Sequence, residues 1–435
     1  MPIQQKLVNV RGERIAVVAG LRTPFVRRNS EFKECYATDL GIMVTNELLN
    51  RLPLAREVVE KFIFGQVIQQ PDVPNLAREI ALTLSMPHAQ AYTLSSSCIT
   101  GLQAVANVCN GIISGSISCG LAGGADSISN APISLKPKVS RTLRDILRTS
   151  SYSKKFNLFK RLSWDDVKLQ QVNLRDALTG YSLGDISEQM AQNFDLSREQ
   201  LDQYTALSHQ RAEQAWQQGM MSEQVMLSHP APYKHYVTRD NMISTQTTAD
   251  YYQRFKPLQS GQHKTVTAWS VSEPADGAAA VLLMREELVE QYGLQPLGYI
   301  RSFALTGNDV WNNMLLGATA ASAKALAWAQ MELGDIDLIE MHESSAAQVL
   351  ANLKLFESRQ FAQSHLQRDQ ALGSIDMDKF NINGGSLAYG SPRAITSLRV
   401  LIQALHQLQR QGGETALIAS GGLGGLGAAM VLERE

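Results

Sequence analysis

Cysteine is scarce in this sequence, which has only four in 435 residues: Cys35, Cys98, Cys109 and Cys119. No two of them form the CxxC pair that is typical of zinc sites, and four are too few for a disulfide scaffold in so long a chain. The scarcity therefore excludes a disulfide-rich secreted protein and a cysteine-based metal site. It favours a reducing cytosol.

An excess of charge and long apolar runs are missing too. The 40 basic and 41 acidic residues give a formal net charge of -1, so we expect no nucleic-acid partner. No run approaches the roughly 18 apolar residues of a membrane span. Residues 1–20 contain Lys6, Arg11, Glu13 and Arg14 in place of the apolar core of a signal peptide. We expect a soluble, cytoplasmic protein without a cleaved leader.

The composition is that of a large globular protein. Hydrophobic residues make up 44% and charged residues 19% of the sequence, a balance that suits an extensive buried core. The 435 residues are about three times the usual domain size of roughly 100–150 residues. We therefore expect two or three packed units.

Strand-like and helix-like patterns alternate in the N-terminal third. Residues 14–19 form a short apolar run, residues 37–52 repeat apolar side chains at helical spacing, and a second helical pattern begins near Cys98 and precedes a strand over 117–122. This alternation predicts the α/β class, with a largely parallel sheet covered by helices.

A similar unit recurs near the C-terminus, where Ser391-Pro392 opens a helical pattern and residues 415–419 return as a strand. The repeat predicts a duplicated core of two βαβ-type halves. We assign the N-terminal half to residues 1–130 and 261–295, an inserted loop domain to 131–260, and the C-terminal half to 296–435.

The inserted segment has a local excess of positive charge. Nine basic residues accompany a single acid, Asp145: Lys136, Lys138, Arg141, Arg144, Arg148, Lys154, Lys155, Lys160 and Arg161. A solvated face and an anion-binding face are both consistent with this pattern. For the second, we favour docking to an acidic protein partner or a membrane surface, because binding a phosphate needs only one or two of the nine cations.

Residues 422–427 read GLGGLG, which has the spacing of a dinucleotide-binding motif. That motif must open a helix and needs an acidic residue about 20 positions later, whereas only a strand-like run to Glu435 follows here. We reject a nicotinamide site and predict a tight hairpin that closely approaches a ligand or another backbone segment.

Cys98 is the strongest candidate for chemistry. It follows three serines at a predicted strand-to-helix junction, where the helix dipole and unpaired N–H groups lower a thiol pKa and stabilise an oxyanion. Cys109 and Cys119 fall at predicted core positions, and Cys35 has no supporting context.

His342 occupies a second such junction, between the strand-like residues 337–341 and the helical pattern of 346–356. A single histidine is more often structural. Because functional side chains gather outside the carboxyl ends of strands in α/β proteins, we nevertheless predict a site that joins His342 to Cys98.

Conserved-looking segments extend along the rest of the chain, and they include GLRTPF (20–25), FGQVIQ (64–69), PNLAREIA (74–81), residues 97–106, AGGADS (122–127), GDISEQMA (184–191), TVTA (265–268), DGAAAV (276–281), MHESSAAQ (341–348), NGGSLAYG (383–390) and GGLGAAMVLE (424–433). Through them the sequence resembles the thiolase superfamily over essentially its whole length. Within that superfamily it most resembles the bacterial 3-ketoacyl-CoA thiolases of fatty-acid oxidation complexes.

The resemblance implies a two-half thiolase core with an inserted loop domain. It implies that Cys98 is acylated by a coenzyme A thioester, that His342 helps to bind the thioester oxygen, and that backbone N–H groups of Cys98 and Leu423 form a second oxyanion hole. Coenzyme A is then part of the substrate, with no permanently bound cofactor and no metal. The expected partners are acyl-CoA or acyl carrier protein and a second copy of the chain, in a homodimer or higher homo-oligomer.

Several positions depart from the family pattern. Ser391 replaces the histidine of the GHP motif, which activates the cysteine, and Gly421 replaces the second cysteine, which acts as acid and base. The HEAF motif reads HESS, and Trp269 begins a changed pantetheine-contacting stretch in which only Ser272 is as expected. We retain Ser391 as a catalytic residue that orients a water, and Ser272, Trp269 and Gly421 as substrate contacts.

A positioned general base contributes about 10²–10⁴-fold to a rate, so the substitutions predict poor removal of a thioester α-proton. A free thiol still supplies some thiolate near neutral pH. The leading hypothesis is a diverged thiolase-like acyltransferase that passes the acyl group from Cys98 to an acceptor needing little base assistance: an amine, a hydroxyl, an acidic carbon or a decarboxylating malonyl-type donor. The alternatives are a 3-ketoacyl-CoA thiolase with rearranged catalytic groups and a catalytically silent structural or CoA-binding subunit.

Overall fold

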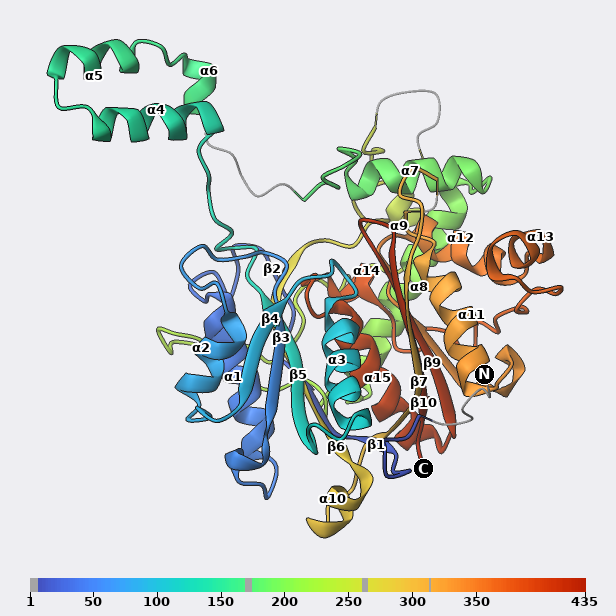
Figure 1. Cartoon of the computed structure of the whole chain (residues 1–435). Helices are drawn as coiled ribbons and strands as arrows, with labels where there is room; N and C mark the ends of the chain where they lie inside the picture. The colour runs from blue at the N-terminus through green and yellow to red at the C-terminus, as the bar shows by residue number, and fades with distance from the viewer. Residues whose placement is uncertain (1–6, 169–173, 260–264, 313) are drawn as a thin grey trace.

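The computed structural model describes residues 7–168, 174–259, 265–312 and 314–435. Its strands are β1 (Ile15–Arg22), β2 (Val26–Arg27), β3 (Lys61–Gly65), β4 (Gln90–Leu94), β5 (Cys119–Asp126), β6 (Ala275–Arg285), β7 (Gly298–Gly307), β8 (Leu338–Met341), β9 (Thr415–Gly422) and β10 (Leu426–Glu433). They form one ten-stranded sheet in the order β4-β3-β5-β6-β1-β7-β10-β9-β8, with β2 paired to β6 (Figure 1). The predicted α/β class is confirmed.

The sheet is mixed, which corrects the expectation of a largely parallel one. The pairs β3–β4, β3–β5 and β8–β9 are parallel. The pairs β1–β6, β1–β7, β5–β6, β7–β10 and β9–β10 are antiparallel. The alternation of strands and helices in the sequence predicts the parallel pairs. The apolar runs that predict strands do not indicate strand direction, so the antiparallel pairs were not predicted. The glycine-rich segment forms the β9–β10 hairpin as predicted, with φ of 81° at Gly424 and 71° at Gly425.

Six helices cover the sheet in layers: α1 (Ala37–Asn50), α2 (Leu76–Thr83), α3 (Thr100–Ile113), α11 (Gly317–Ala329), α12 (Ala346–Phe356) and α15 (Thr396–Gln411). The apolar faces of α1 and α2 enter one core cluster and those of α11 and α12 a second. Helices α3 and α15 share the third cluster, in the middle of the molecule (Figure 1). Helices α3 and α15 therefore lie between α1 and α2 on one side and α11 and α12 on the other (Figure 1).

The central helices approach each other closely where Gly101 meets Leu398. A Cβ atom at Gly101 would lie 2.7 Å from the Cβ of Leu398 and 3.0 Å from its backbone nitrogen. Only the absence of a side chain permits this spacing. The first turn of α3 is thereby held against the first turn of α15.

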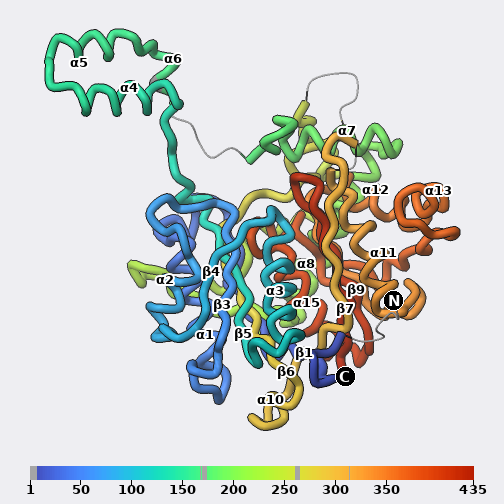
Figure 2. The backbone as a smooth tube through the Cα atoms, viewed as in Figure 1, coloured from blue at the N-terminus to red at the C-terminus, as the bar shows by residue number. Residues whose placement is uncertain are grey.

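The segment between β5 and β6 contains two groups of helices. Helices α4 (Pro137–Arg148), α5 (Tyr152–Phe159) and α6 (Trp164–Val167) form an arm that stands away from the body, whereas α7 (Leu183–Asn193), α8 (Arg198–Gln217) and α9 (Ala249–Gln253) pack on it (Figures 1 and 2). The domain boundaries at 130, 260 and 295 remain a proposal.

Short elements complete the fold: α10 (Glu286–Gln291), α13 (Arg359–Phe361), α14 (Ser386–Tyr389), the 3₁₀ turns η1 (Arg56–Val58) and η2 (Leu333–Asp335), and the π turn η3 (Ala362–Leu366). The helix expected to open at Ser391-Pro392 begins instead at Thr396, because residues 392–395 form a turn whose Ile395 N–H donates to the Pro392 carbonyl. Among the described helices, none is long and apolar enough to cross a membrane.

Candidate active site

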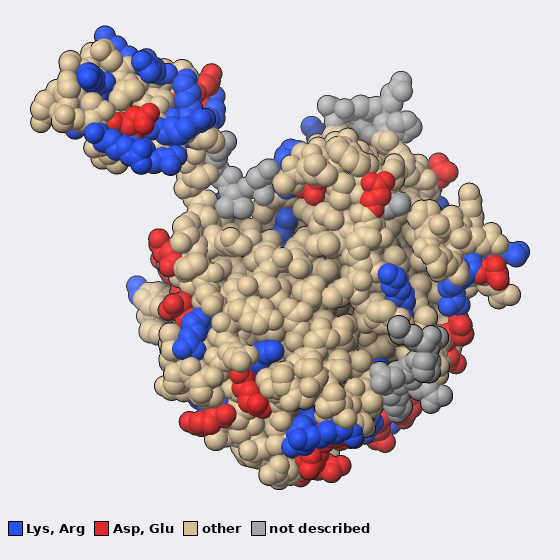
Figure 3. Space-filling view, in the orientation of Figure 1, with Lys and Arg blue, Asp and Glu red and all other residues tan. Residues whose placement is uncertain are grey.

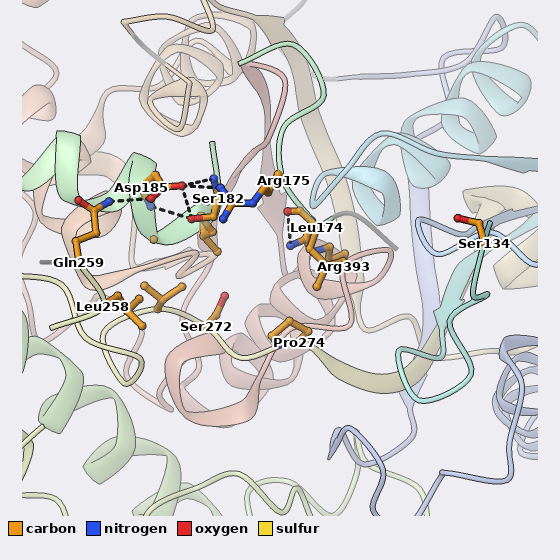
Figure 4. Close-up of a pocket in the computed structure, with 13 residues that line it drawn as sticks. Ser134, Leu174, Arg175, Ser182, Asp185, Leu258, Gln259, Ser272, Pro274 and Arg393 are labelled. Carbon is orange, nitrogen blue, oxygen red and sulfur yellow. Dashed lines mark hydrogen bonds and ion pairs between the residues drawn. The ribbon is translucent and has the colours of Figure 1, made fainter. Parts of the chain in front are cut away.

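A small buried cavity lies among the carboxyl ends of the strands and the first residues of the central helices. Its volume is about 10 Å³, and its walls are Cys98, Leu183, Ser272, Pro274, Leu315, His342, Ser344, Ser391, Arg393 and Leu423. A larger pocket of about 1050 Å³ shares Leu183, Ser272, Pro274 and Arg393 with it; Figure 4 shows this outer pocket. The two form a wide entrance with a narrow inner end at Cys98.

Cys98 lies between the end of β4 and the start of α3, in a tightly held turn. Ser97 adopts a left-handed φ of 50°, and Thr100 fixes the turn by accepting from the Ser96 N–H at 2.7 Å and donating to the Ser97 carbonyl at 2.6 Å. These bonds leave the Cys98 side chain 7% exposed on the cavity wall. Cys98 therefore lies at a strand-to-helix junction, as predicted.

The electrostatics of Cys98 combine two opposing effects. Burial raises the pKa of its thiol, and the nearby Arg393 guanidinium and a hydrogen bond from Ser97 lower it, with the net shift upward. Most Cys98 is therefore the neutral thiol at pH 7. The N–H groups of Ile99 and Thr100 at this helix start donate to the Ser96 and Ser97 carbonyls.

His342 directly follows β8, and its backbone N–H donates to the Ala419 carbonyl of β9 at 2.8 Å. Its Nδ1 lies 2.9 Å from the Ser386 hydroxyl, while its buried Nε2 has no hydrogen-bond partner. Burial lowers the pKa of His342 to about 3, with smaller contributions from Arg399 and Arg393. The imidazole is therefore neutral at physiological pH and has one ring nitrogen available to a ligand in the cavity.

The neighbouring Glu343 holds this segment in place. Its carboxylate accepts hydrogen bonds from the Tyr204 hydroxyl at 2.8 Å, the Ser208 hydroxyl at 2.7 Å, the Asn381 amide at 3.0 Å and the Leu387 N–H at 3.1 Å. Four donors satisfy a carboxylate that is fully buried. Glu343 thus links α8 and α14 to the end of β8 and fixes the orientation of His342.

Three further predicted residues line the same cavity. The buried Ser272 hydroxyl has no hydrogen-bond partner. The Ser391 hydroxyl lies 3.5 Å from that of Thr396, and its backbone N–H donates to Glu273. Leu423 occupies the β9–β10 turn. A Cβ at the adjacent Gly422 would lie 3.2 Å from the Cys98 nitrogen, so this glycine lets the turn approach the Cys98 backbone.

Two predicted residues are not on the cavity wall. Gly421 lies within β9, and a Cβ there would point toward the Leu315 carbonyl oxygen at 3.1 Å. Trp269 packs in an aromatic cluster with His209, Tyr252 and Phe255, with ring centroids 5.4–5.7 Å apart. Trp269 therefore packs among aromatic side chains, and its contact with substrate stays a prediction. Cys35, Cys109 and Cys119 are buried in the core, away from the cavity walls.

Sequence reasoning missed Arg393, two positions after Ser391. Its side chain is 9% exposed and belongs to the walls of both the cavity and the outer pocket. The sequence did contain a sign of its importance, because Arg393 is a charged residue at the otherwise apolar start of a predicted helix. Among the described residues, no group of three His, Cys, Asp or Glu side chains is arranged to hold a metal ion.

Comparison with known proteins identifies the family. Residues 15–287 match the model of the thiolase N-terminal domain and residues 294–434 that of the thiolase C-terminal domain. The chain is 44% identical over 432 residues to the 3-ketoacyl-CoA thiolase of Colwellia psychrerythraea and 46% identical over 430 residues to that of Escherichia coli O6:K15:H31, with 99% of each chain covered.

Solved structures agree with the sequence matches. Human mitochondrial 3-ketoacyl-CoA thiolase gives a TM-score of 0.83 at 28% identity, covering 97% of this chain and 99% of that one. Its complex with CoA gives 0.81 at 27% identity, covering 97% and 98%. With the cavity, both domain models and full-length relatives in agreement, the chain belongs to the thiolase superfamily of acyltransferases.

Proposed function

We propose that this protein is a diverged thiolase-superfamily acyltransferase in which Cys98 accepts an acyl group from a thioester and passes it to a second substrate. The observation that supports this most directly is the composition of the cavity. Its described walls include one thiol, that of Cys98, and one neutral imidazole, that of His342, and among the described residues they include no second cysteine, second histidine or carboxylate.

The acylation step needs few groups. The Cys98 thiolate attacks the carbonyl carbon of the donor thioester, a new C–S bond forms, the old one breaks, and the donor thiolate leaves and takes up a proton. The partner-free Nε2 of His342 supplies one hydrogen bond to the thioester oxygen when Ser386 donates to Nδ1. Backbone N–H groups of Cys98 and Leu423 are the proposed donors of a second oxyanion hole.

Donor binding is assigned to the outer pocket. Its volume of about 1050 Å³ lies at the upper end of the usual range for small-molecule sites, roughly 300–1,000 Å³. A coenzyme A thioester is the proposed substrate, and the CoA complex of a human relative supports this assignment. An acyl carrier protein is the alternative donor. Coenzyme A then acts as substrate and leaving group, with no permanently bound cofactor.

The divergence concerns proton transfer. Two substitutions are proposed. Ser391 has a hydroxyl where the family pattern has an imidazole, and Gly421 has only a hydrogen atom where the pattern has a thiol. A hydroxyl cannot replace a base worth about 10²–10⁴-fold. We therefore infer that the acceptor is an amine, a hydroxyl, an already acidic carbon or a decarboxylating malonyl-type donor.

Two other functions are the alternatives to be tested. The first is thiolysis of 3-ketoacyl-CoA with rearranged catalytic groups, and it is favoured by the names of relatives that are 44–46% identical over their full length. The raised pKa of the Cys98 thiol is compatible with a silent subunit that binds CoA without reacting.

Intact-mass spectrometry after incubation with a panel of acyl-CoA and acyl-carrier-protein donors separates the three. Acyltransferase function predicts an adduct that disappears in Cys98→Ala and persists in Cys109→Ala, which removes the other thiol of that helix region. Rapid release of acetyl-CoA from acetoacetyl-CoA and CoA would instead support the thiolase. Absence of an adduct with every donor would support the silent subunit.

The remaining assignments are a cytoplasmic location, a homodimer or higher homo-oligomer and no nucleic-acid partner. The near-zero net charge of -1 supports the last of these. Equilibrium sedimentation of the whole chain measures the oligomeric state, and a monomer at micromolar concentration would contradict the proposed assembly.

We propose that the arm formed by α4, α5 and α6 docks on an anionic membrane surface. The nine basic residues noted in the sequence all lie on it, and Figure 3 shows their concentration there relative to the body. Exposed apolar side chains accompany them: Leu147, Tyr152, Phe156, Phe159 and Trp164, which are 61–91% exposed. Mixed basic and apolar surfaces of helices are typical of interfacial membrane binding, whereas an acidic protein partner does not require exposed aromatics.

Co-sedimentation with vesicles tests the arm. We expect binding to vesicles rich in phosphatidylglycerol, little binding to phosphatidylcholine, and weaker binding at 1 M salt, where the Debye length falls to about 3 Å. Reversal of Arg144, Arg148, Lys154 and Lys155 to glutamate should abolish binding and preserve Cys98 acylation. The matched control reverses four exposed cations of the body, Lys33, Lys234, Arg254 and Lys256. Binding to acidic carrier protein without vesicle binding would contradict the membrane assignment.

A further inference from the structure

Arg393 places a positive charge next to the proposed nucleophile. Its side chain is 91% buried, being 9% exposed, and it borders the Cys98 cavity on one side and the outer pocket on the other. In Figure 4 it lies on the pocket wall, with its guanidinium directed to the Leu174 carbonyl. That hydrogen bond, from Nη2 at 3.2 Å, uses one of five guanidinium donors.

The charge of Arg393 has no ion-pair partner within the described part of the chain, where no carboxylate lies within 4.0 Å of its guanidinium. Asp126 is an acid that interacts with it at longer range. That carboxylate already accepts from the Val67, Ile68 and Ala394 N–H groups at 2.9, 2.8 and 2.7 Å, and burial raises its pKa to about 6. A buried cation without a close counter-ion is costly unless a ligand supplies the opposite charge.

The position of this cation limits what the ligand is. Arg393 shares the cavity with Cys98, His342 and Ser272, so an anion bound to it belongs to the acyl portion of the thioester, beside the reacting carbonyl. The guanidinium fork matches a carboxylate through two parallel hydrogen bonds. Because the carboxylate would meet Arg393 and the thioester carbonyl would meet Cys98 on the wall of the same cavity, the acyl chain that joins them is short.

We propose that Arg393 binds the free carboxylate of a short dicarboxylic acyl group, so that the preferred donor is a malonyl-, succinyl- or glutaryl-type thioester. This inference rests on the acyltransferase function proposed above and specifies its substrate class. The carboxylate pairs with Arg393 while the thioester carbonyl meets Cys98 and His342. No covalent step beyond acylation of Cys98 is added.

The first test compares acylation rates by intact-mass spectrometry for donors that differ in the terminal carboxylate. Succinyl-CoA is paired with butyryl-CoA, and glutaryl-CoA with valeryl-CoA. We expect the charged donor of each pair to react at least 10-fold faster, the effect of a charge-assisted hydrogen bond of about 1.5–3 kcal/mol. In Arg393→Gln this ratio should fall to about one, and Arg393→Lys should keep part of it. Because Arg393 lowers the pKa of the Cys98 thiol, its loss also slows both donors of a pair equally, which leaves the ratio unaffected by that change.

The matched control is Arg175→Gln. Arg175 also lines the outer pocket but pairs with Asp185 at 3.0 Å, and it is outside the wall of the Cys98 cavity. Its replacement should leave the ratio of charged to uncharged donors unchanged. A ratio of charged to uncharged donors that stays unchanged in Arg393→Gln, with all donors slowed alike, would overturn the proposal.

A second measurement does not depend on thioester chemistry. Iodoacetate and iodoacetamide alkylate the same thiol and differ in a carboxylate, so their rate ratio at Cys98, located by peptide mass, reports an anion-binding group beside the sulfur. We expect Arg393→Gln to lower this ratio at least 5-fold. If no thioester reacts but the ratio falls, the proposed function fails and the anion site stands; if thioesters react without preference and the ratio is unchanged, only the inference about Arg393 fails.

Discussion

The starts of the two central helices are alike in position and unlike in chemistry. Helix α3 begins two residues after Cys98 and α15 five residues after Ser391, and both side chains line the same cavity. One contributes a polarizable thiol and the other a hydroxyl. Packing of the two central helices therefore brings two side chains to one cavity, and the proposed functions of the two positions differ because their residue types differ.

The supports of the two positions differ as well. The Cys98 turn is held by the Thr100 side chain and by a left-handed Ser97. Ser391 is held by the backbone, through its N–H bond to Glu273 and the Ala275 N–H bond to its carbonyl. A side chain at position 391 can therefore be exchanged without removing the contacts that fix its backbone.

The largest expected effect on acylation comes from replacing either Cys98 or Ser391 with alanine. Cys98→Ala should reduce acyl-adduct formation by at least 10³-fold, because no other described side chain on the cavity wall can form the thioester. Ser391→Ala should change the acylation rate by less than about 10-fold, because the Ser391 hydroxyl is not a general base and a water molecule can occupy its place. Stopped-flow acylation followed by mass analysis measures both. Equal losses would show that the two helix starts act as one catalytic unit.

A second expected effect concerns pH. Because burial raises the pKa of the Cys98 thiol, the thiolate fraction should grow tenfold for each pH unit below that pKa, and acylation should rise about 100-fold between pH 6 and pH 8. The pKa of His342 near 3 adds no inflection in this range. Initial rates in constant-ionic-strength buffers provide the profile. An acylation rate that does not change with pH would show that a general base deprotonates the Cys98 thiol.

Introducing the two side chains of the proposed family pattern should narrow the difference between the helix starts. We expect the double variant Ser391→His, Gly421→Cys to raise acetoacetyl-CoA thiolysis at least 10-fold over the unmodified protein, because a positioned base adds about 10²–10⁴-fold and part of that gain is lost to imperfect geometry. The Cβ at position 421 would lie 3.1 Å from the Leu315 carbonyl, a contact that a small shift relieves. Either single variant is the control, and robust thiolysis before any change would contradict the proposed divergence.

The contact that joins the two helices provides the smallest of these effects. Gly101→Ala places a methyl group 2.7 Å from the Leu398 Cβ, and such overpacking costs about 1–3 kcal/mol of unfolding free energy. Gly334→Ala is the matched control, because no atom lies within 4 Å of the added carbon there. Urea titration measures both. A neutral Gly101→Ala would mean that the helices separate easily, which would weaken the idea of a fixed juxtaposition of Cys98 and Ser391.

Much of this arrangement is readable in the sequence, because helical periodicity and junction residues are local signals. The predicted helix over residues 346–356 matches α12 to the residue, and the segment 415–419 falls within β9. The junction positions of Cys98 and His342 also follow from local patterns, and the structure brings both to one cavity.

Non-local features are harder to derive. Strand direction depends on which distant segments pair, so the antiparallel direction of β6 (Ala275–Arg285), which lies within residues 261–295, was not predicted. The packing of Trp269 among His209, Tyr252 and Phe255 could not be predicted, because it depends on where α8 and α9 lie. Arg393 resembles any surface cation in the sequence, and only burial on a cavity wall distinguishes it.

Strand β1 has a consequence for recombination between members of this superfamily. It pairs with β6 on one side and with β7 on the other, so the first strand of the chain joins the sequence regions on either side of the border near residue 290. Exchanging one half for that of a relative must preserve the register across this seam as well as the fold of each part. The two halves are therefore constrained to change together, and a chimera inherits activity only where both edges of β1 still fit.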